Sequence, residues 1–117
     1  MIEQLISRVF YTRNVAHWTH WRTHSFAQHS ALNTFYDDII GNIDEIVEAY
    51  QGRFELVGAI PAPGSAPSDI LEHITAECKW IETNRSEIAQ NIPAIENLVD
   101  ELSGIYLSTI YKLKNLK

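Results

Sequence analysis

The sequence has 117 residues, of which 45% are apolar and 21% charged, and its formal net charge is −6. The length fits one domain over residues 1–117, and the apolar share excludes a disordered chain. The acidic balance disfavours a role in binding nucleic acid, and no apolar run approaches the roughly 20 residues that cross a bilayer. One cysteine and a start without a signal-peptide core indicate a cytoplasmic protein.

Apolar residues recur at three- and four-residue steps along most of the chain. This spacing predicts amphipathic helices over about 1–22, 26–51, 68–90 and 92–115. Ser25 and Gln28 have the spacing of a capping box, so a helix can start there, although no strong breaker excludes one unbroken helix through this region. Glycines and prolines between 52 and 67 predict a connection. We therefore expect an all-α fold.

Two short turns and one long connection indicate a four-helix bundle. A connection of roughly 16 residues reaches about 50 Å when extended, whereas the helix before it is about 38 Å long. The connection can therefore run the length of the bundle as a crossover. It can equally form a loop between antiparallel neighbours, so the topology stays open.

Four of the five histidines lie between positions 17 and 29. At about 100° per residue, His17, His20 and His24 share a face that continues the apolar stripe of Ile2, Ile6 and Phe10. Imidazoles on a core-facing stripe need hydrogen-bond partners or a metal ion. A single such histidine is more often a satisfied core group, but three on one face also indicate a metal site.

Carboxylates follow on the second predicted helix. Asp44 and Glu48 are one turn apart, which lets two oxygen ligands meet one cation. His29 and Asp44 are about 22 Å apart along a straight helix, so one chain cannot bring them to one ion. In a twofold dimer, the antiparallel helix of the partner subunit can place its own Asp44 beside His29. The ordinary alternative is that His29, Asp44 and Glu48 lie on a solvent-exposed flank of the helix and bind nothing.

The pair His17-Trp18, followed by His29, Asp44 and Glu48, resembles the ligand pattern of Dps-type miniferritins. The resemblance covers about residues 14–50. It implies a ferritin-like four-helix bundle, a homo-oligomer built on a twofold dimer, and an iron ferroxidase centre that two mates share. Two departures are Arg22-Thr23 in place of a glycine in the turn, and Asn33 where the family often has an aspartate.

A second resemblance starts three residues later. The segment from His20-Trp21 through Ser25-Phe26-Ala27 to His29, with the later ending Tyr50-Gln51-Gly52, is similar to small uncharacterised ferritin-like proteins of tailed phages. This resemblance puts His20 ahead of His17 as a metal ligand, and both remain candidates.

The leading hypothesis is a metal site formed by His20 or His17, His29, and a mate's Asp44 and Glu48. A mixed nitrogen and oxygen ligand set suits iron, and also manganese or zinc. The alternative is a non-enzymatic, oligomeric helical binding module, such as a phage-encoded factor that engages a host protein or nucleotide. His73 and Glu77 also have chelating spacing, but we interpret them as a surface pair.

Overall fold

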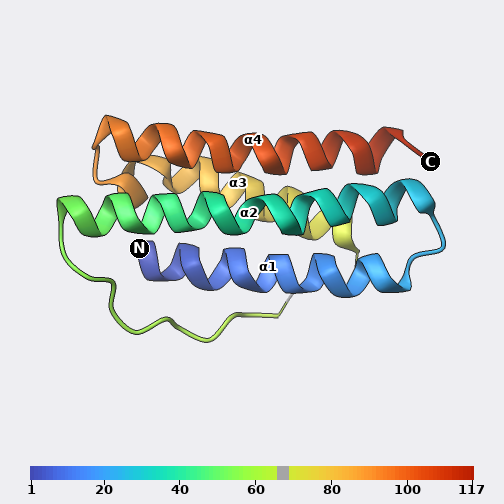
Figure 1. The fold of residues 1–117 in the computed structure, drawn as a ribbon, viewed down its shortest axis with the longest axis horizontal. Helices are drawn as coiled ribbons and strands as arrows, with labels where there is room; N and C mark the ends of the chain where they lie inside the picture. The colour runs from blue at the N-terminus through green and yellow to red at the C-terminus, as the bar shows by residue number, and fades with distance from the viewer. Residues whose placement is uncertain (66–68) are drawn as a thin grey trace.

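A computed structural model describes residues 1–65 and 69–117 of the chain. These residues form four α-helices, namely α1 (Ile2–Arg22), α2 (Phe26–Arg53), α3 (Ile70–Ala89) and α4 (Pro93–Asn115) (Figure 1). Neither described range contains a strand, so the predicted all-α class is confirmed. The predicted start of the third helix at residue 68, and the last residues of the predicted connection, lie outside the described ranges.

The turns follow local sequence signals. The Ser25 side chain accepts a hydrogen bond from the backbone N–H of Gln28 at 3.2 Å, which caps the start of α2. Thr23 is extended, with φ −72° and ψ 148°, so α1 ends at Arg22 and the helix is not continuous through this region. Between α3 and α4, Gln90 and Asn91 both adopt positive φ, and Pro93 then begins α4.

The helices pack in a ring in which α1 and α4 each contact both α2 and α3. In Figure 1, α2 and α3 run in the same direction, and the connection between them returns along the side of the bundle next to α1. Of the two topologies that the sequence left open, the structure therefore has the long crossover. The molecule measures 44 × 26 × 22 Å, so its long axis follows the helices.

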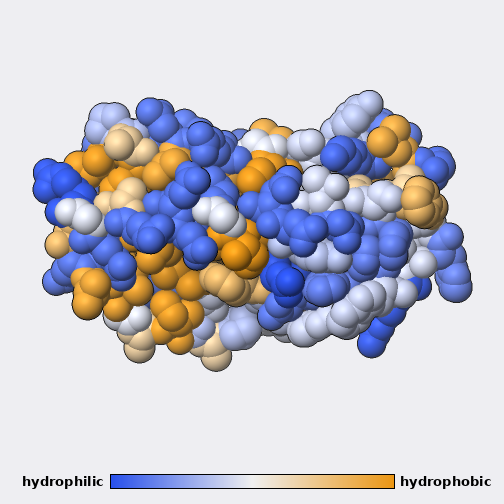
Figure 2. Space-filling model, in the orientation of Figure 1, coloured by the Kyte–Doolittle hydropathy of each residue, from blue (hydrophilic) through white to orange (hydrophobic). Residues whose placement is uncertain are grey.

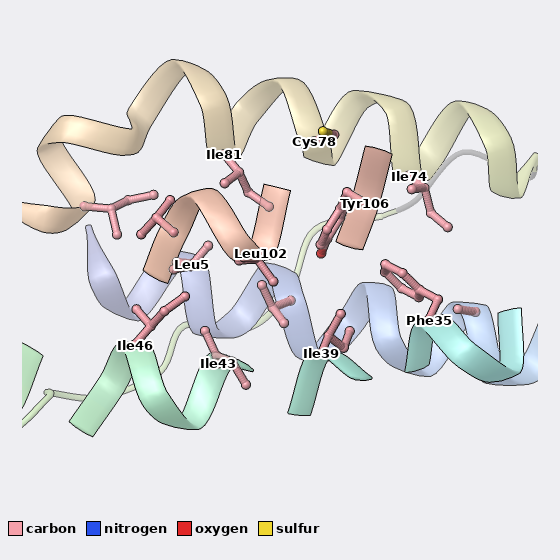
Figure 3. Packing of buried hydrophobic residues seen from close by; sticks show 14 of the residues in the cluster. Leu5, Phe35, Ile39, Ile43, Ile46, Ile74, Cys78, Ile81, Leu102 and Tyr106 are labelled. Carbon is pink, nitrogen blue, oxygen red and sulfur yellow. The ribbon is translucent and has the colours of Figure 1, made fainter. Parts of the chain in front are cut away.

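The core lies along the bundle axis and takes residues from all four helices. Figure 3 shows Leu5 of α1, Ile39 of α2, Ile81 of α3 and Leu102 of α4 pointing into the space between the helices. Each of these side chains is almost fully buried, and burial of this kind contributes roughly 1.5–3 kcal/mol per large aliphatic side chain. Phe10, which the sequence placed on the inward stripe, is instead 40% exposed.

The connection lies on the outside of the bundle and keeps several large apolar residues exposed, namely Phe54, Leu56 and Ile60. Figure 2 shows apolar residues gathered over the half of this face that carries the start of α1 and the first part of the connection. The N–H of Gly58 donates to Glu3 Oε2 of α1 at 2.8 Å, which holds the connection against the bundle. Among the described residues, no helix combines the length and apolar character that crossing a membrane requires.

Candidate functional site

Two histidines meet where α1 ends and α2 begins. His20 is in the last turn of α1, and His29 is in the first turn of α2. Their rings stack, with centroids 3.6 Å apart and planes inclined by 17°. The short turn after Arg22 reverses the chain, so it brings together two residues that are nine positions apart in sequence.

The hydrogen bonds of the pair are reciprocal. His20 Nδ1 lies 2.7 Å from the backbone oxygen of His29, and His29 Nδ1 lies 2.8 Å from the backbone oxygen of His20. Because a carbonyl oxygen only accepts, each Nδ1 must carry the proton. In the neutral rings, each Nε2 then keeps its lone pair, which is the form that binds a metal ion. The bond to His20 also satisfies a carbonyl that the end of α1 leaves without a helical partner.

His17 and Tyr36 form a second aromatic layer next to this pair. His17 stacks on Tyr36 of α2, with centroids 4.0 Å apart and planes inclined by 15°. His17 is farther from His20, at 5.9 Å between centroids, than His29 is. Of the two histidines that the sequence kept open, the structure therefore places His20 beside His29 and His17 against Tyr36.

Polar groups surround His17. Its pKa is lowered chiefly by burial, then by the neighbouring Arg13 and His20, against an opposing effect of Asp37. The hydroxyl of Tyr36 donates to Asn33 Oδ1 at 2.7 Å, and Asn33 Nδ2 donates to Asp37 Oδ2 at 3.3 Å. Asn33 therefore joins the aromatic layer to a carboxylate on the outer face of α2.

The predicted carboxylate ligands lie elsewhere on α2. Asp44 and Glu48 are both exposed, and α2 is one continuous helix from residue 26 to residue 53. Asp44 is therefore about 22 Å from His29 along the helix axis. Within the described residues of one chain, no group of three or more His, Cys, Asp or Glu side chains is arranged to hold a metal ion. Within one subunit, the candidate ligands therefore form two separate sets: the three histidines at the α1–α2 junction, and the two carboxylates farther along α2. The sequence spacing predicts this separation.

His24 does not join the other histidines. The prediction that it shares the face of His17 and His20 is wrong, because α1 ends at Arg22 and His24 lies exposed in the turn. Large aromatic side chains are exposed near the imidazole pair: Trp21 is 67% exposed and Phe26 is 81% exposed. Aromatic residues exposed to this degree are typical of an interface with another molecule.

A second polar cluster lies between α1 and α3. His73 is only 2% exposed, and its Nε2 lies 3.0 Å from the hydroxyl of Thr12. Glu77 accepts hydrogen bonds on both carboxylate oxygens from Arg8 Nη1, each at 3.0 Å. The interpretation of His73 and Glu77 as a surface pair is therefore wrong for His73. The sequence does contain a signal for this burial, because the spacing of His73 from Ile70 and Ile74 places it on the apolar face of the helix.

Burial changes the chemistry of the groups near this cluster. The pKa of His73 is lowered by burial, which outweighs the opposing charge of Glu77. Burial, with a contact from Cys78 Sγ to Glu82, raises the pKa of the Cys78 thiol to about 12, so Cys78 is inert as a nucleophile. The hydroxyl of Tyr106 is fully buried and has no hydrogen-bond partner among the described residues.

Comparison with known proteins gives a family and a phage relative. The chain is 25% identical over 99 residues to an uncharacterised 14.6 kDa protein from the mobD–ri intergenic region of Enterobacteria phage T4, an alignment that covers 83% of this chain and 75% of the phage protein. No solved structure matches significantly. A family model matches residues 20–113, which include His20, His29, Asp44 and Glu48. The chain therefore belongs to the family of unknown function DUF5856.

Proposed function

We propose that this protein is a ferritin-like, metal-binding homo-oligomer whose metal site is shared between two copies of the chain. The observation that carries the proposal is the His20–His29 pair. Both Nδ1 atoms are committed to backbone carbonyls, so both Nε2 lone pairs are available to a cation. The crossover between α2 and α3 supports the ferritin-like assignment, because such a connection is typical of that bundle.

The other ligands are the partner's Asp44 and Glu48. If two α2 helices pair in antiparallel fashion about a twofold axis between residues 38 and 39, His29 faces the partner's Glu48. The same register sets Asn33 opposite the partner's Asp44. Gly41 lies near the middle of this stretch, is exposed, and has open space where a side chain would stand. A helical glycine that costs about 1 kcal/mol relative to alanine is explained when a partner helix approaches there.

Charge makes this pairing depend on a cation. Asp37, Asp44 and Glu48 lie on the same side of α2, so two facing helices bring together carboxylates of both copies. Like charges facing one another oppose association, and a divalent cation between them offsets that repulsion. A ligand set of imidazole nitrogen and carboxylate oxygen suits iron, and also manganese or zinc. With iron, the implied activity is ferroxidase, the oxidation of iron(II) to iron(III) by oxygen or peroxide.

Metal content and native mass on one tag-free sample test the proposal. We expect roughly one iron, manganese or zinc ion per chain in a dimer or larger assembly, and dissociation in EDTA. His29→Ala and Glu48→Gln should each abolish stoichiometric binding. Glu101→Gln, which removes the same charge from an exposed position on α4, should leave it unchanged. A monomer that takes up no added iron(II), manganese(II) or zinc(II) would refute the shared site.

A second candidate function is a non-enzymatic, oligomeric binding module, such as one that a phage encodes to engage a host protein or nucleotide. One observation favours it: the reciprocal bonds of His20 and His29 already give both rings a structural role in holding the turn. Under this alternative, His29→Ala lowers stability, and metal content is zero before and after the substitution. The two candidates therefore differ in the metal content of the unmodified protein.

A further inference from the structure

A pocket of about 360 Å³ lies between α1 and α3, on the side of the bundle that the connection crosses. Its walls are formed by Arg8 and Tyr11 of α1 and by His73, Glu77 and Trp80 of α3, and residues 61–65 of the connection lie over it. Its volume is at the small end of the range for ligand sites in proteins. The proposed metal site does not use any of these residues.

The charged groups of the pocket are held in place. Arg8 Nη1 donates to both oxygens of Glu77, and Arg8 Cζ lies 4.3 Å from the centre of the Trp80 ring. A guanidinium on an aromatic face beside a carboxylate has little freedom to move. Among the described residues, the hydrogen bonds of Arg8 use only Nη1, so its other N–H groups remain available to a ligand.

The pair presents donors and acceptors side by side with no net charge. Arg8 offers N–H donors, and the adjacent carboxylate of Glu77 offers acceptor lone pairs. An anionic ligand would be repelled by Glu77, and a cationic ligand by Arg8. The matching ligand is neutral and carries a carbonyl next to an N–H group. Tyr11, Pro61 and Pro63 add apolar surface, which favours a flat ring.

We propose that this pocket binds a nucleobase through a cyclic amide edge, as found in guanine and uracil, with the carbonyl accepting from Arg8 and the N–H donating to Glu77. The pocket is half-open, so a sugar attached to the base can remain in solvent. Adenine lacks the ring carbonyl that Arg8 requires. A site whose polar groups lose their partners discriminates strongly against such an analogue.

Nucleosides serve as probes because they carry no phosphate charge. Guanosine, uridine and adenosine are titrated into the full chain, and the indole N–H signal of Trp80 is followed by NMR with Trp18 and Trp21 as internal references. We expect saturable shifts of the Trp80 signal with guanosine or uridine, and at least tenfold weaker binding of adenosine. The absence of a Trp80 shift at millimolar concentrations of all three nucleosides would overturn the proposal.

Variants connect binding to the two polar groups. Glu77→Gln and Arg8→Lys should each weaken binding at least tenfold, whereas Glu87→Gln, at an exposed position on α3, should not change it. Arg8→Lys keeps the positive charge, so it tests the pocket even if Glu77→Gln fails to fold by circular dichroism. Unchanged binding in a folded Arg8→Lys protein would contradict the assignment.

The base could come from a free nucleoside or from a nucleotide, and guanosine 5′-monophosphate separates the two sources. Affinity equal to or below that of guanosine supports recognition of the base alone. Tenfold tighter binding of the monophosphate would show that the site reads the phosphate, and the neutral-ligand proposal would be wrong.

Discussion

The stacked histidines allow a double-mutant test of the α1–α2 junction in the absence of metal. Both hydrogen bonds of the pair run from a ring to a backbone carbonyl. Each bond therefore survives when the other ring is replaced by alanine. The two single substitutions, His20→Ala and His29→Ala, each remove one bond, and the coupling energy between them reports only the contact of the two rings.

The structure sets the size of each effect. A neutral hydrogen bond contributes about 1 kcal/mol, so each single substitution should lower the free energy of unfolding by at least that amount. His20 should cost more than His29, because His20 is buried and His29 is partly exposed. Rings stacked at 3.6 Å should add a coupling of about 0.5–1.5 kcal/mol.

Urea unfolding of the four proteins in EDTA measures these energies. A parallel cycle that pairs His24→Ala with His29→Ala is the control, because His24 is exposed in the turn and should act additively. Additivity of His20 and His29 within about 0.3 kcal/mol would refute the stacked arrangement.

Three further predictions concern single residues. Tyr106→Phe should leave stability unchanged or raise it by about 1–2 kcal/mol in thermal unfolding, because it removes a buried hydroxyl that has no hydrogen-bond partner among the described residues, and a loss above 2 kcal/mol would show that this hydroxyl bonds to the nearby Thr12. Gly104→Ala should stabilise the chain by about 1 kcal/mol in any oligomeric state, whereas Gly41→Ala should do so only in the monomer and should weaken dimers measured by sedimentation. The pKa of His73 is lowered in the folded state, so the unfolded chain binds more protons as pH falls below about 6.5, and stability should decrease between pH 7 and pH 5. His73→Gln should flatten that decrease more than His17→Gln does, and equal slopes in wild type and the His73 variant would contradict the assignment.

The helices, and the proximity of His20 and His29 at the α1–α2 junction, follow from local patterns in the sequence. Spacing of apolar residues predicts the helices, and Ser25 with Gln28 predicts the start of α2. Once a turn is placed there, His20 and His29 are adjacent by necessity. Their ring geometry does not follow, because it depends on the extended backbone of Thr23, which sets how closely the two helix ends approach.

Other features depend on tertiary packing that a single sequence does not encode locally. The burial of His73 depends on Thr12, which lies 61 positions earlier and becomes its neighbour only when α1 and α3 pack together. The sequence does not determine the path of the connection, because a connection of this length permits both a crossover and a loop between antiparallel helices. The exposure of Phe10 shows the limit of a helical stripe, since residues at its edge can lie on either side of the packing boundary.

The crossover between α2 and α3 also divides the protein into two helical hairpins, α1–α2 and α3–α4, each closed by its own short turn. Each hairpin forms quickly from local contacts but leaves its half of the core open to water until the other hairpin covers it. A long connection does not require both hairpins to come from the same chain. At high concentration, two chains can therefore exchange hairpins, and a protein cleaved within the connection can reassemble from its two halves.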